Sequence, residues 1–259
     1  MRKIHSIFEE DQADGIVITH GTNTLEETAY FLNLVLKTEK PVVLVGSMRP
    51  SSAISADGYP NVVNAVRVAA SSQSLGRGCL VVMNDTIFNA RDVTKNSTYR
   101  VEAFKSRDLG PLGFADTDGK VVYYHQPARK HTTQTEFDVR TMRSLPRVDV
   151  VLSYVNADAV MIDAAVKAGA QGIVSAATGA GRPTPAQDDA FDRAYQEHGV
   201  IMCLCSRVAS GRIVRSPGLK RRGFVASDNL QPWKARILLS LGLSKTTDAD
   251  DLQRMFDTY

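Results

Sequence analysis

Three residues of this sequence, two with hydroxyl groups and one lysine, have the types and spacing that suit acyl-transfer chemistry. Thr22 follows the apolar run Ile16–Ile18, Ser47 follows a second apolar run, and Lys95 lies in the loop after a third. A hydroxyl beside a lysine that can lose its proton forms a nucleophile and base pair. Backbone N–H groups at the start of the helix that follows Thr22 would stabilise a developing oxyanion. We therefore expect Thr22, Ser47 and Lys95 to meet in one pocket.

Each of these residues also has a purely structural explanation. Thr24 followed by Glu27 is a capping-box pattern, so Thr22 or Thr24 would serve to cap the helix. Lys95 would be a solvated surface lysine, and His20 a hydrogen-bonded structural histidine at the strand end. Spacing alone therefore supports a polar pocket in an α/β protein and leaves its use open.

A regular alternation of short apolar strands and amphipathic helices positions these residues. The predicted strands are apolar runs that end in polar corners, at 14–21, 41–48, 79–85, 148–155, 172–178 and 200–208. The predicted helices carry apolar residues at helical spacing, at 24–38, 61–72, 157–170, 184–199, 231–244 and 248–259. This alternation predicts mainly parallel sheets flanked by helices, which bind ligands beyond the carboxyl ends of their strands. The segment 86–97, which contains Lys95, is expected to be a loop.

The polar, aperiodic stretch 125–146 separates two such alternations. We predict an N-terminal α/β domain over 1–124, an interdomain connection over 125–146 and a C-terminal α/β domain over 147–259. Apolar residues at positions 1, 4, 7 and 8 have no capping residue before them, which indicates the tail of a helix. The chain is therefore expected to be truncated at its N-terminus or to carry a wrongly assigned start.

Composition argues against several classes of function. The net charge is +3, from 31 basic and 28 acidic residues, which gives no reason to expect nucleic acid or a membrane as a partner. Cys203 and Cys205 are expected to be buried thiols on one face of a strand, and no metal site is expected. Nucleotide-binding motifs such as G-x-G-x-x-G are absent from the sequence.

No apolar run reaches the roughly 18 residues that a membrane span requires. The first residues do not resemble a signal peptide, so the expected location is cytoplasmic. A signal peptide would have been lost with any missing N-terminal segment, which leaves export as the alternative.

The stretch DGIVITHGTNTLEETAYFL resembles the second signature of the bacterial type L-asparaginases and glutaminase-asparaginases, G-x-x-x-H-G-T-D-T followed by an aliphatic residue. The resemblance continues through KPVVLVGSMRPSSAISADGYPNVVNAV, VVMNDTIFNARDVTK and FVASDNLQPWKAR, and it covers essentially the whole chain. It implies two α/β domains and hydrolysis of the side-chain amide of L-asparagine, or of L-glutamine, to the acid and ammonia. The implied reaction uses a threonine nucleophile and neither metal nor cofactor.

The resemblance also assigns roles to individual positions of this chain. It implies catalytic roles for Thr22, Asn23 and Lys95. It implies substrate-binding roles for Gly21, Ser47 and Met48. The implied assembly is a homo-oligomer, either a dimer or a tetramer, in which the C-terminal domain of a partner closes each pocket.

The sequence departs from the family pattern at several positions. Nothing in residues 1–14 matches the strand ending in T-G-G-T-I-A, whose threonine is the primary nucleophile of the family. The aspartate of H-G-T-D-T is Asn23 here. The G-N-G-N stretch of the family is Gly179–Arg182, and its acidic residue before the GFVAS strand falls near Ser216.

The change at position 23 bears directly on substrate binding. A hydrogen bond to a charged partner contributes roughly 1.5–3 kcal/mol, so the neutral amide of Asn23 is expected to weaken asparagine binding. We expect this chain to hydrolyse asparagine very weakly or not at all. The alternative is a catalytically inactive relative that acts as a binding or interaction protein.

Overall fold

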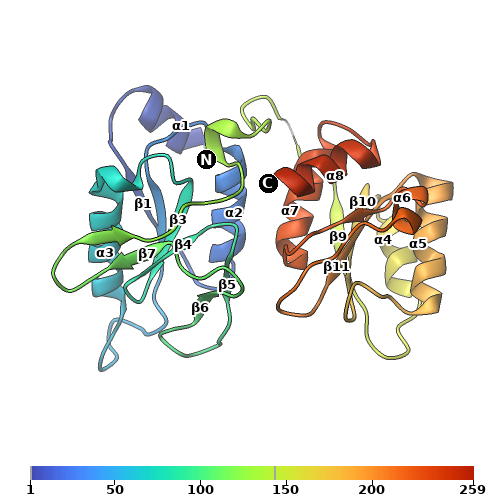
Figure 1. The fold of residues 1–259 in the computed structure, drawn as a ribbon, viewed down its shortest axis with the longest axis horizontal. Coiled ribbons are helices and arrows are strands. Elements are labelled where there is room, and N and C mark those ends of the chain that lie inside the picture. The colour runs from blue at the N-terminus through green and yellow to red at the C-terminus, as the bar shows by residue number, and fades with distance from the viewer. Residues whose placement is uncertain (1, 143) are drawn as a thin grey trace. The chain divides into compact units, whose positions relative to one another are not determined.

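The chain divides into two compact α/β units, residues 1–140 and 141–259 (Figure 1). This division comes from a computed structural model, which describes residues 2–142 and 144–259. Both units contain a sheet flanked by helices, which confirms the predicted fold class. The predicted limits of the domains stay a prediction.

The first unit is built around a six-stranded sheet of order β1-β2-β3-β4-β7-β8. Its strands are β1 (Ile16–Thr19), β2 (Val42–Val45), β3 (Cys79–Met83), β4 (Thr86–Asn89), β7 (Gly113–Ala115) and β8 (Val121–Tyr123). The first three strands are parallel, and the other neighbours pair antiparallel. A separate two-stranded ribbon pairs β5 (Val93–Lys95) antiparallel with β6 (Phe104–Ser106).

Helices cover both faces of this sheet (Figure 1). The helical segments are α1 (Arg2–Glu9), α2 (Leu25–Val35), α3 (Gly58–Ala70) and the 3-10 turns η1 (Ser72–Ser74) and η2 (Thr132–Gln134). Along β2, Val42 and Leu44 belong to the core under α2, whereas Val43 and Val45 belong to the core under α3. This alternation follows from the two-residue period of a strand. Each such buried side chain contributes roughly 1.5–3 kcal/mol.

The second unit contains a four-stranded parallel sheet of order β12-β11-β10-β9. Its strands are β9 (Val148–Leu152), β10 (Gly172–Ala177), β11 (Ile201–Ser206) and β12 (Val225–Ala226). Its helices are α4 (Val160–Lys167), α5 (Pro185–His198), α6 (Pro217–Arg221), α7 (Pro232–Leu243) and α8 (Ala249–Thr258). Cys203 and Cys205 are buried on β11, as the sequence predicts, and burial raises the pKa of Cys205 to about 11.

The prediction of a loop over 86–97 is wrong, because β4 and β5 lie within it. Asn84 and Asp85 have φ angles of 50° and 61°, and they join β3 to β4 with Met83 opposite Thr86. Two central residues with positive φ form the two-residue turn that suits a twisted hairpin. The Asn-Asp pair between two apolar runs was the signal for this hairpin.

Part of the predicted connection 125–146 packs on α2. Lys37 Nζ donates hydrogen bonds to the carbonyl oxygens of Thr132 at 3.2 Å and Thr135 at 2.6 Å. The Thr135 hydroxyl donates to the Leu34 carbonyl at 2.6 Å, and Phe137 is fully buried. These contacts hold the segment against the first unit.

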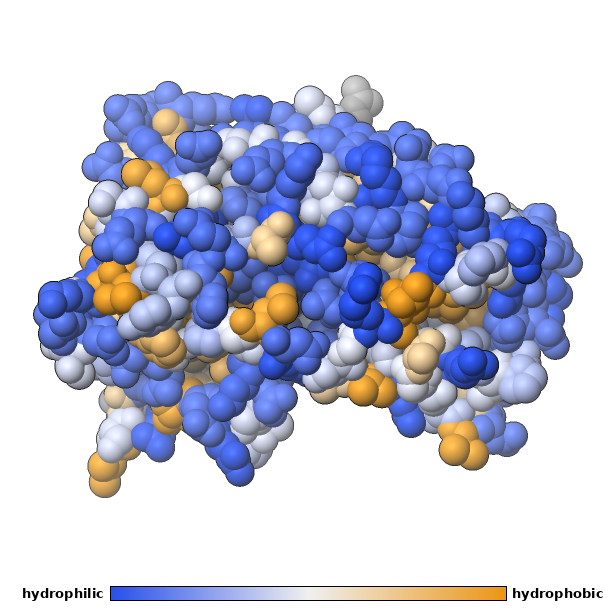
Figure 2. All heavy atoms as spheres, viewed as in Figure 1, coloured by the Kyte–Doolittle hydropathy of each residue, from blue (hydrophilic) through white to orange (hydrophobic). Residues whose placement is uncertain are grey.

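The face shown in Figure 2 carries mainly hydrophilic residues, with hydrophobic residues scattered between them. Within residues 2–142 and 144–259, no helix is long and apolar enough to cross a membrane. Among the same residues, no three His, Cys, Asp or Glu side chains are grouped to hold a metal ion.

Candidate functional site

Thr22 and Lys95 meet at the carboxyl end of β1, although 73 positions separate them in the sequence. Lys95 Nζ donates a hydrogen bond to Thr22 Oγ1 at 2.8 Å and another to Asn23 Oδ1 at 3.1 Å. A nucleophile and its base need about 2.6–3.2 Å between heavy atoms. The amine is therefore placed to exchange a proton with the hydroxyl.

The corner that carries Thr22 is fixed by His20. The His20 ring donates from Nδ1 to the Gly21 carbonyl at 2.7 Å, so Nε2 accepts from the Thr28 hydroxyl at 3.0 Å. Both ring nitrogens are thus used in holding the corner against α2, which is the structural role considered for this histidine. Gly46 directly follows β2. A Cβ added to it would lie 2.8 Å from the His20 carbonyl oxygen and 3.0 Å from Thr22 Cγ2. Glycine at position 46 therefore permits the close approach of this corner.

The buried carboxylate of Glu26 connects α2 to the strand that carries Lys95. Its Oε1 accepts a hydrogen bond from the Lys95 backbone N–H at 3.1 Å, and the residue is only 5% exposed. Thr24 is the N-cap residue of α2, but its side chain makes no capping hydrogen bond. The capping-box explanation is therefore wrong for Thr24, while the Thr22 hydroxyl accepts from Lys95.

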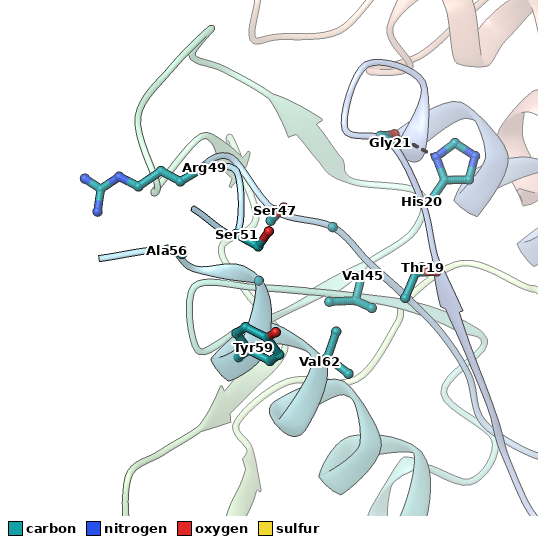
Figure 3. A pocket seen from close by; sticks show the side chains of 12 residues that line it. Thr19, His20, Gly21, Val45, Ser47, Arg49, Ser51, Ala56, Tyr59 and Val62 are labelled. Atoms are coloured by element: carbon teal, nitrogen blue, oxygen red, sulfur yellow. Dashed lines mark hydrogen bonds between the residues drawn. The ribbon is translucent and has the colours of Figure 1, made fainter. Parts of the chain in front are cut away.

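Two separate hollows adjoin this corner. The first, of about 530 Å³, is lined by Gly21, Ser47 and Tyr59 among others (Figure 3). The second, of about 560 Å³, is lined by Asn23, Lys95 and residues 96–99. We call them the Ser47 hollow and the Lys95 hollow. Thr22 is the residue between Gly21, which lines the first hollow, and Asn23, which lines the second.

The expected convergence of Thr22, Ser47 and Lys95 on one pocket stays a prediction for Ser47, which lines the Ser47 hollow. The loop that carries Ser47 leads from β2 into α3. The ribbon that carries Lys95 is tied to α2 through Glu26. Ser47 lines the first hollow and Lys95 the second, and α2 and α3 cover opposite faces of the sheet (Figure 1).

A buried network that the sequence analysis missed holds the ends of β2 and β3 together. The carboxylate of Asp57 accepts the Met48 backbone N–H at 2.9 and 3.1 Å. Asn61 donates from Nδ2 to the Gly46 carbonyl at 3.0 Å and accepts the Asn84 backbone N–H at 2.9 Å. Because the Met48 N–H is already bound, it is not offered to a substrate. Asp57, four positions before the predicted helix 61–72, was the only signal for this network.

Both halves of the chain match family models. The model described as "Asparaginase, N-terminal" matches residues 1–129, and the "Glutaminase/Asparaginase C-terminal domain" model matches residues 147–256. This chain belongs to the asparaginase family. The family indicated by the GTNT corner and the runs that follow it is thereby confirmed.

Individual members of the asparaginase family match nearly the whole chain. L-asparaginase 2 of Bacillus subtilis (strain 168) is 45% identical over 258 residues, which cover 100% of this chain and 68% of that protein. L-asparaginase 2 of Escherichia coli (strain K12) is 48% identical over 251 residues, covering 96% and 72%. Glutaminase-asparaginase of Pseudomonas fluorescens biotype A is 45% identical over 262 residues, covering 100% and 71%.

A solved asparaginase structure shares the fold. The crystal structure of the probable cytoplasmic L-asparaginase from Campylobacter jejuni superimposes with a TM-score of 0.96 at 44% identity. The match covers 99% of this chain and 83% of that one. At this identity the fold described above is that of an asparaginase.

Proposed function

We propose that this chain is an amidohydrolase that converts the side-chain amide of L-asparagine, or of L-glutamine, to the acid and ammonia. The observation that carries the proposal is the 2.8 Å hydrogen bond between Lys95 Nζ and Thr22 Oγ1 at the carboxyl end of β1. Relatives named L-asparaginase 2 and glutaminase-asparaginase support the substrate class.

Thr22 and Lys95 divide the proposed chemistry between them. Lys95, as the neutral amine, takes the proton of the Thr22 hydroxyl while Oγ1 attacks the amide carbon. The tetrahedral intermediate then releases ammonia with a proton returned by Lys95, and water hydrolyses the ester that remains on Thr22. The first N–H groups of α2, which begins at Leu25, carry the partial positive charge that suits the oxyanion.

The remaining site residues hold these groups and the substrate. Asn23 gives Lys95 a second acceptor at 3.1 Å, which orients the amine toward Thr22. Gly21 and Ser47 line the adjoining hollow and are proposed to contact the rest of the substrate. Met48 packs its side chain against the core under α2, so its proposed contribution is to the shape of the site. No cofactor is required by this reaction.

The proposed assembly is a homo-oligomer, a dimer or a tetramer, in the cytoplasm. The name of the Campylobacter jejuni protein supports a cytoplasmic location, whereas a relative from Haemophilus influenzae is named as a probable periplasmic L-asparaginase. Light scattering on the purified chain measures the assembly, and cell fractionation measures the location.

Release of ammonia from asparagine and glutamine tests the activity. Because Asn23 supplies no carboxylate, turnover is expected below the usual enzyme range of roughly 1–10³ per second. Substitution of Lys95→Met is expected to lower kcat a further 10²–10⁴-fold, about the contribution of a positioned base. Lys105→Met is the matched control, since Lys105 lies on β6 of the same ribbon with its side chain half exposed.

Two results would contradict the proposal. One is the absence of ammonia above background with the unsubstituted chain, which would favour the binding role instead. The other is equal activity of the Lys95→Met and Lys105→Met variants.

A further inference from the structure

The proposed reaction needs the side chain of Lys95 as the neutral amine, because an ammonium cannot accept the proton of Thr22. A carboxylate is bound to the same lysine, since Glu26 Oε1 accepts the Lys95 backbone N–H at 3.1 Å. Glu26 is buried, so water screens its charge poorly. Acting alone, this negative charge would favour the ammonium of Lys95 over the amine.

Arg107 is a cation that interacts with the same carboxylate. It directly follows β6, the strand that pairs with β5, so it belongs to the ribbon that carries Lys95. Burial lowers the pKa of Arg107, and the negative charges of Glu26 and Asp108 oppose that shift. An arginine remains charged in such surroundings. The carboxylate of Glu26 therefore lies under the influence of a positive charge that does not titrate.

The other charged and titratable side chains around Lys95 do not replace this cation. Lys105 on β6 is half exposed, so water screens its charge. His20 uses both ring nitrogens in the hydrogen bonds of the corner. The titratable residues on the elements around Lys95 are Glu26 and Glu27 on α2, Lys105 on β6, His20 in the corner, and Tyr99 and Arg100 in the loop after β5. Of these, only Glu26 is buried.

We propose that Arg107 is a positioning residue of the amide hydrolysis, which acts on Lys95 through Glu26. Its guanidinium offsets the charge of the buried carboxylate, so Glu26 holds the Lys95 backbone without favouring the ammonium of the same residue. The inference rests on the proposed function, because it takes Lys95 as the base. It separates two effects of Glu26 on Lys95, a hydrogen bond that fixes the strand and a charge that Arg107 cancels.

Substitution of Arg107→Met tests the inference through the pH dependence of kcat/KM for L-asparagine. The acid limb of this profile is the rise in activity that follows loss of a proton from the base. It is expected to move to higher pH by about one unit, which lowers activity below the limb about tenfold. Above the limb, activity is expected to stay within about twofold of the unsubstituted chain, because the base is then neutral in both.

Two further variants control for the loss of the arginine itself. Arg107→Lys keeps the positive charge and is expected to keep the acid limb in place. Arg100→Met removes the same charge from an exposed position in the loop between β5 and β6. It is expected to leave the acid limb unmoved, because water screens a charge at that position.

Substitution of Glu26→Gln tests the same balance from the other side. The amide keeps an oxygen that accepts the Lys95 backbone N–H but carries no charge. With Arg107 in place, the acid limb is expected to move to lower pH. The double variant Glu26→Gln with Arg107→Met carries neither charge, so its acid limb is expected within about 0.3 unit of that of the unsubstituted chain.

A fall in kcat/KM of Arg107→Met at every pH, with the acid limb unmoved, would overturn the inference and leave the proposed function standing. If Arg107→Met does not fold, Glu26→Gln carries the same test with the opposite sign.

If no amide releases ammonia, the proposed function fails, and chemical labelling decides the inference separately. Acetic anhydride reacts with the neutral amine of lysine, so peptide mass spectrometry of Lys95 across a pH series measures that form directly, with Lys105 as the internal reference. A Lys95 labelling profile at higher pH in Arg107→Met, or at lower pH in Glu26→Gln, would support the inference. An unmoved profile would overturn it.

Discussion

Each unit has a threonine within three residues of the end of a parallel strand, and the two hydroxyls have different partners. After β1 in the first unit, Thr22 Oγ1 accepts from Lys95, a residue of a distant strand. After β10 in the second unit, Thr178 Oγ1 donates to the Arg182 carbonyl at 2.7 Å, four positions along the chain. The backbones of Thr178 and Arg182 also form an isolated β-bridge.

The difference shows that the position of a threonine at a strand end does not by itself indicate chemistry. At Thr178 the hydroxyl closes a local turn, so its proton is already donated to a carbonyl four positions along the chain. At Thr22 the local bonds of the corner are made by His20 instead, through both of its ring nitrogens. The Thr22 hydroxyl is thereby left to a long-range partner that can exchange a proton.

The largest expected effect comes from removing each threonine hydroxyl in turn. Thr22→Ala is expected to lower kcat/KM for the preferred amide by at least about 10³-fold, as loss of a nucleophile does. Thr178→Ala is expected to leave activity within about twofold and to lower the free energy of unfolding by about 0.5–1.5 kcal/mol, one hydrogen bond. Ammonia release and urea unfolding measure the two quantities.

Thr22→Ser is the control for this comparison, because it retains the hydroxyl and should retain much of the activity. Equal loss of activity in Thr22→Ala and Thr178→Ala would show that the contrast between the two corners is not functional.

A smaller effect is expected from filling the space that lets the first corner form. A Cβ at Gly46 would press on the His20 carbonyl and on Thr22, so Gly46→Ala is expected to cost about 1–3 kcal/mol of stability and about tenfold in kcat. In the second unit, a Cβ at Gly218 would meet only Ser216 Oγ at 3.7 Å. Gly218→Ala is therefore expected to change stability by less than about 0.5 kcal/mol. The same two assays apply, and an undisturbed Gly46→Ala variant would contradict the packing argument.

The smallest expected effect is a difference between the units in their response to acid. Burial lowers the pKa of His131 and of His5, both in the first unit. The unfolded chain then binds protons that the folded unit does not, so this part of the stability is present above the unfolded value near 6.5 and is lost as the pH falls below it. Residues 141–259 contain one histidine, His198, which is exposed.

Urea unfolding at pH 7.5 and at pH 5.5 measures this difference. The single tryptophan, Trp233, reports on the second unit, and circular dichroism reports on both. We expect the circular dichroism transition to move to lower urea at pH 5.5 while the Trp233 transition moves less. His131→Asn should reduce the shift and His198→Asn should not. A Trp233 transition that moves as far as the rest would contradict the assignment to the first unit.

The sequence by itself determined the elements and the family of this protein. Period-two and helical patterns place β1, α2, β2 and most later elements within a few residues of their observed bounds. Such patterns depend only on which face of a single segment is apolar. The corner GTNT carried enough of a known pattern to indicate the asparaginase family. The polar residue types at the strand ends were likewise visible without coordinates.

Only the tertiary structure decided which of those polar residues meet. Lys95 reaches Thr22 because the hairpin at Asn84 and Asp85 turns the chain back, and because Glu26 then holds the Lys95 backbone against α2. Ser47 lines the hollow beside the loop that leads from β2 to α3. Apolar periodicity is a local property of a segment, whereas contacts across 73 positions depend on turn conformation and on buried hydrogen bonds that no single segment encodes.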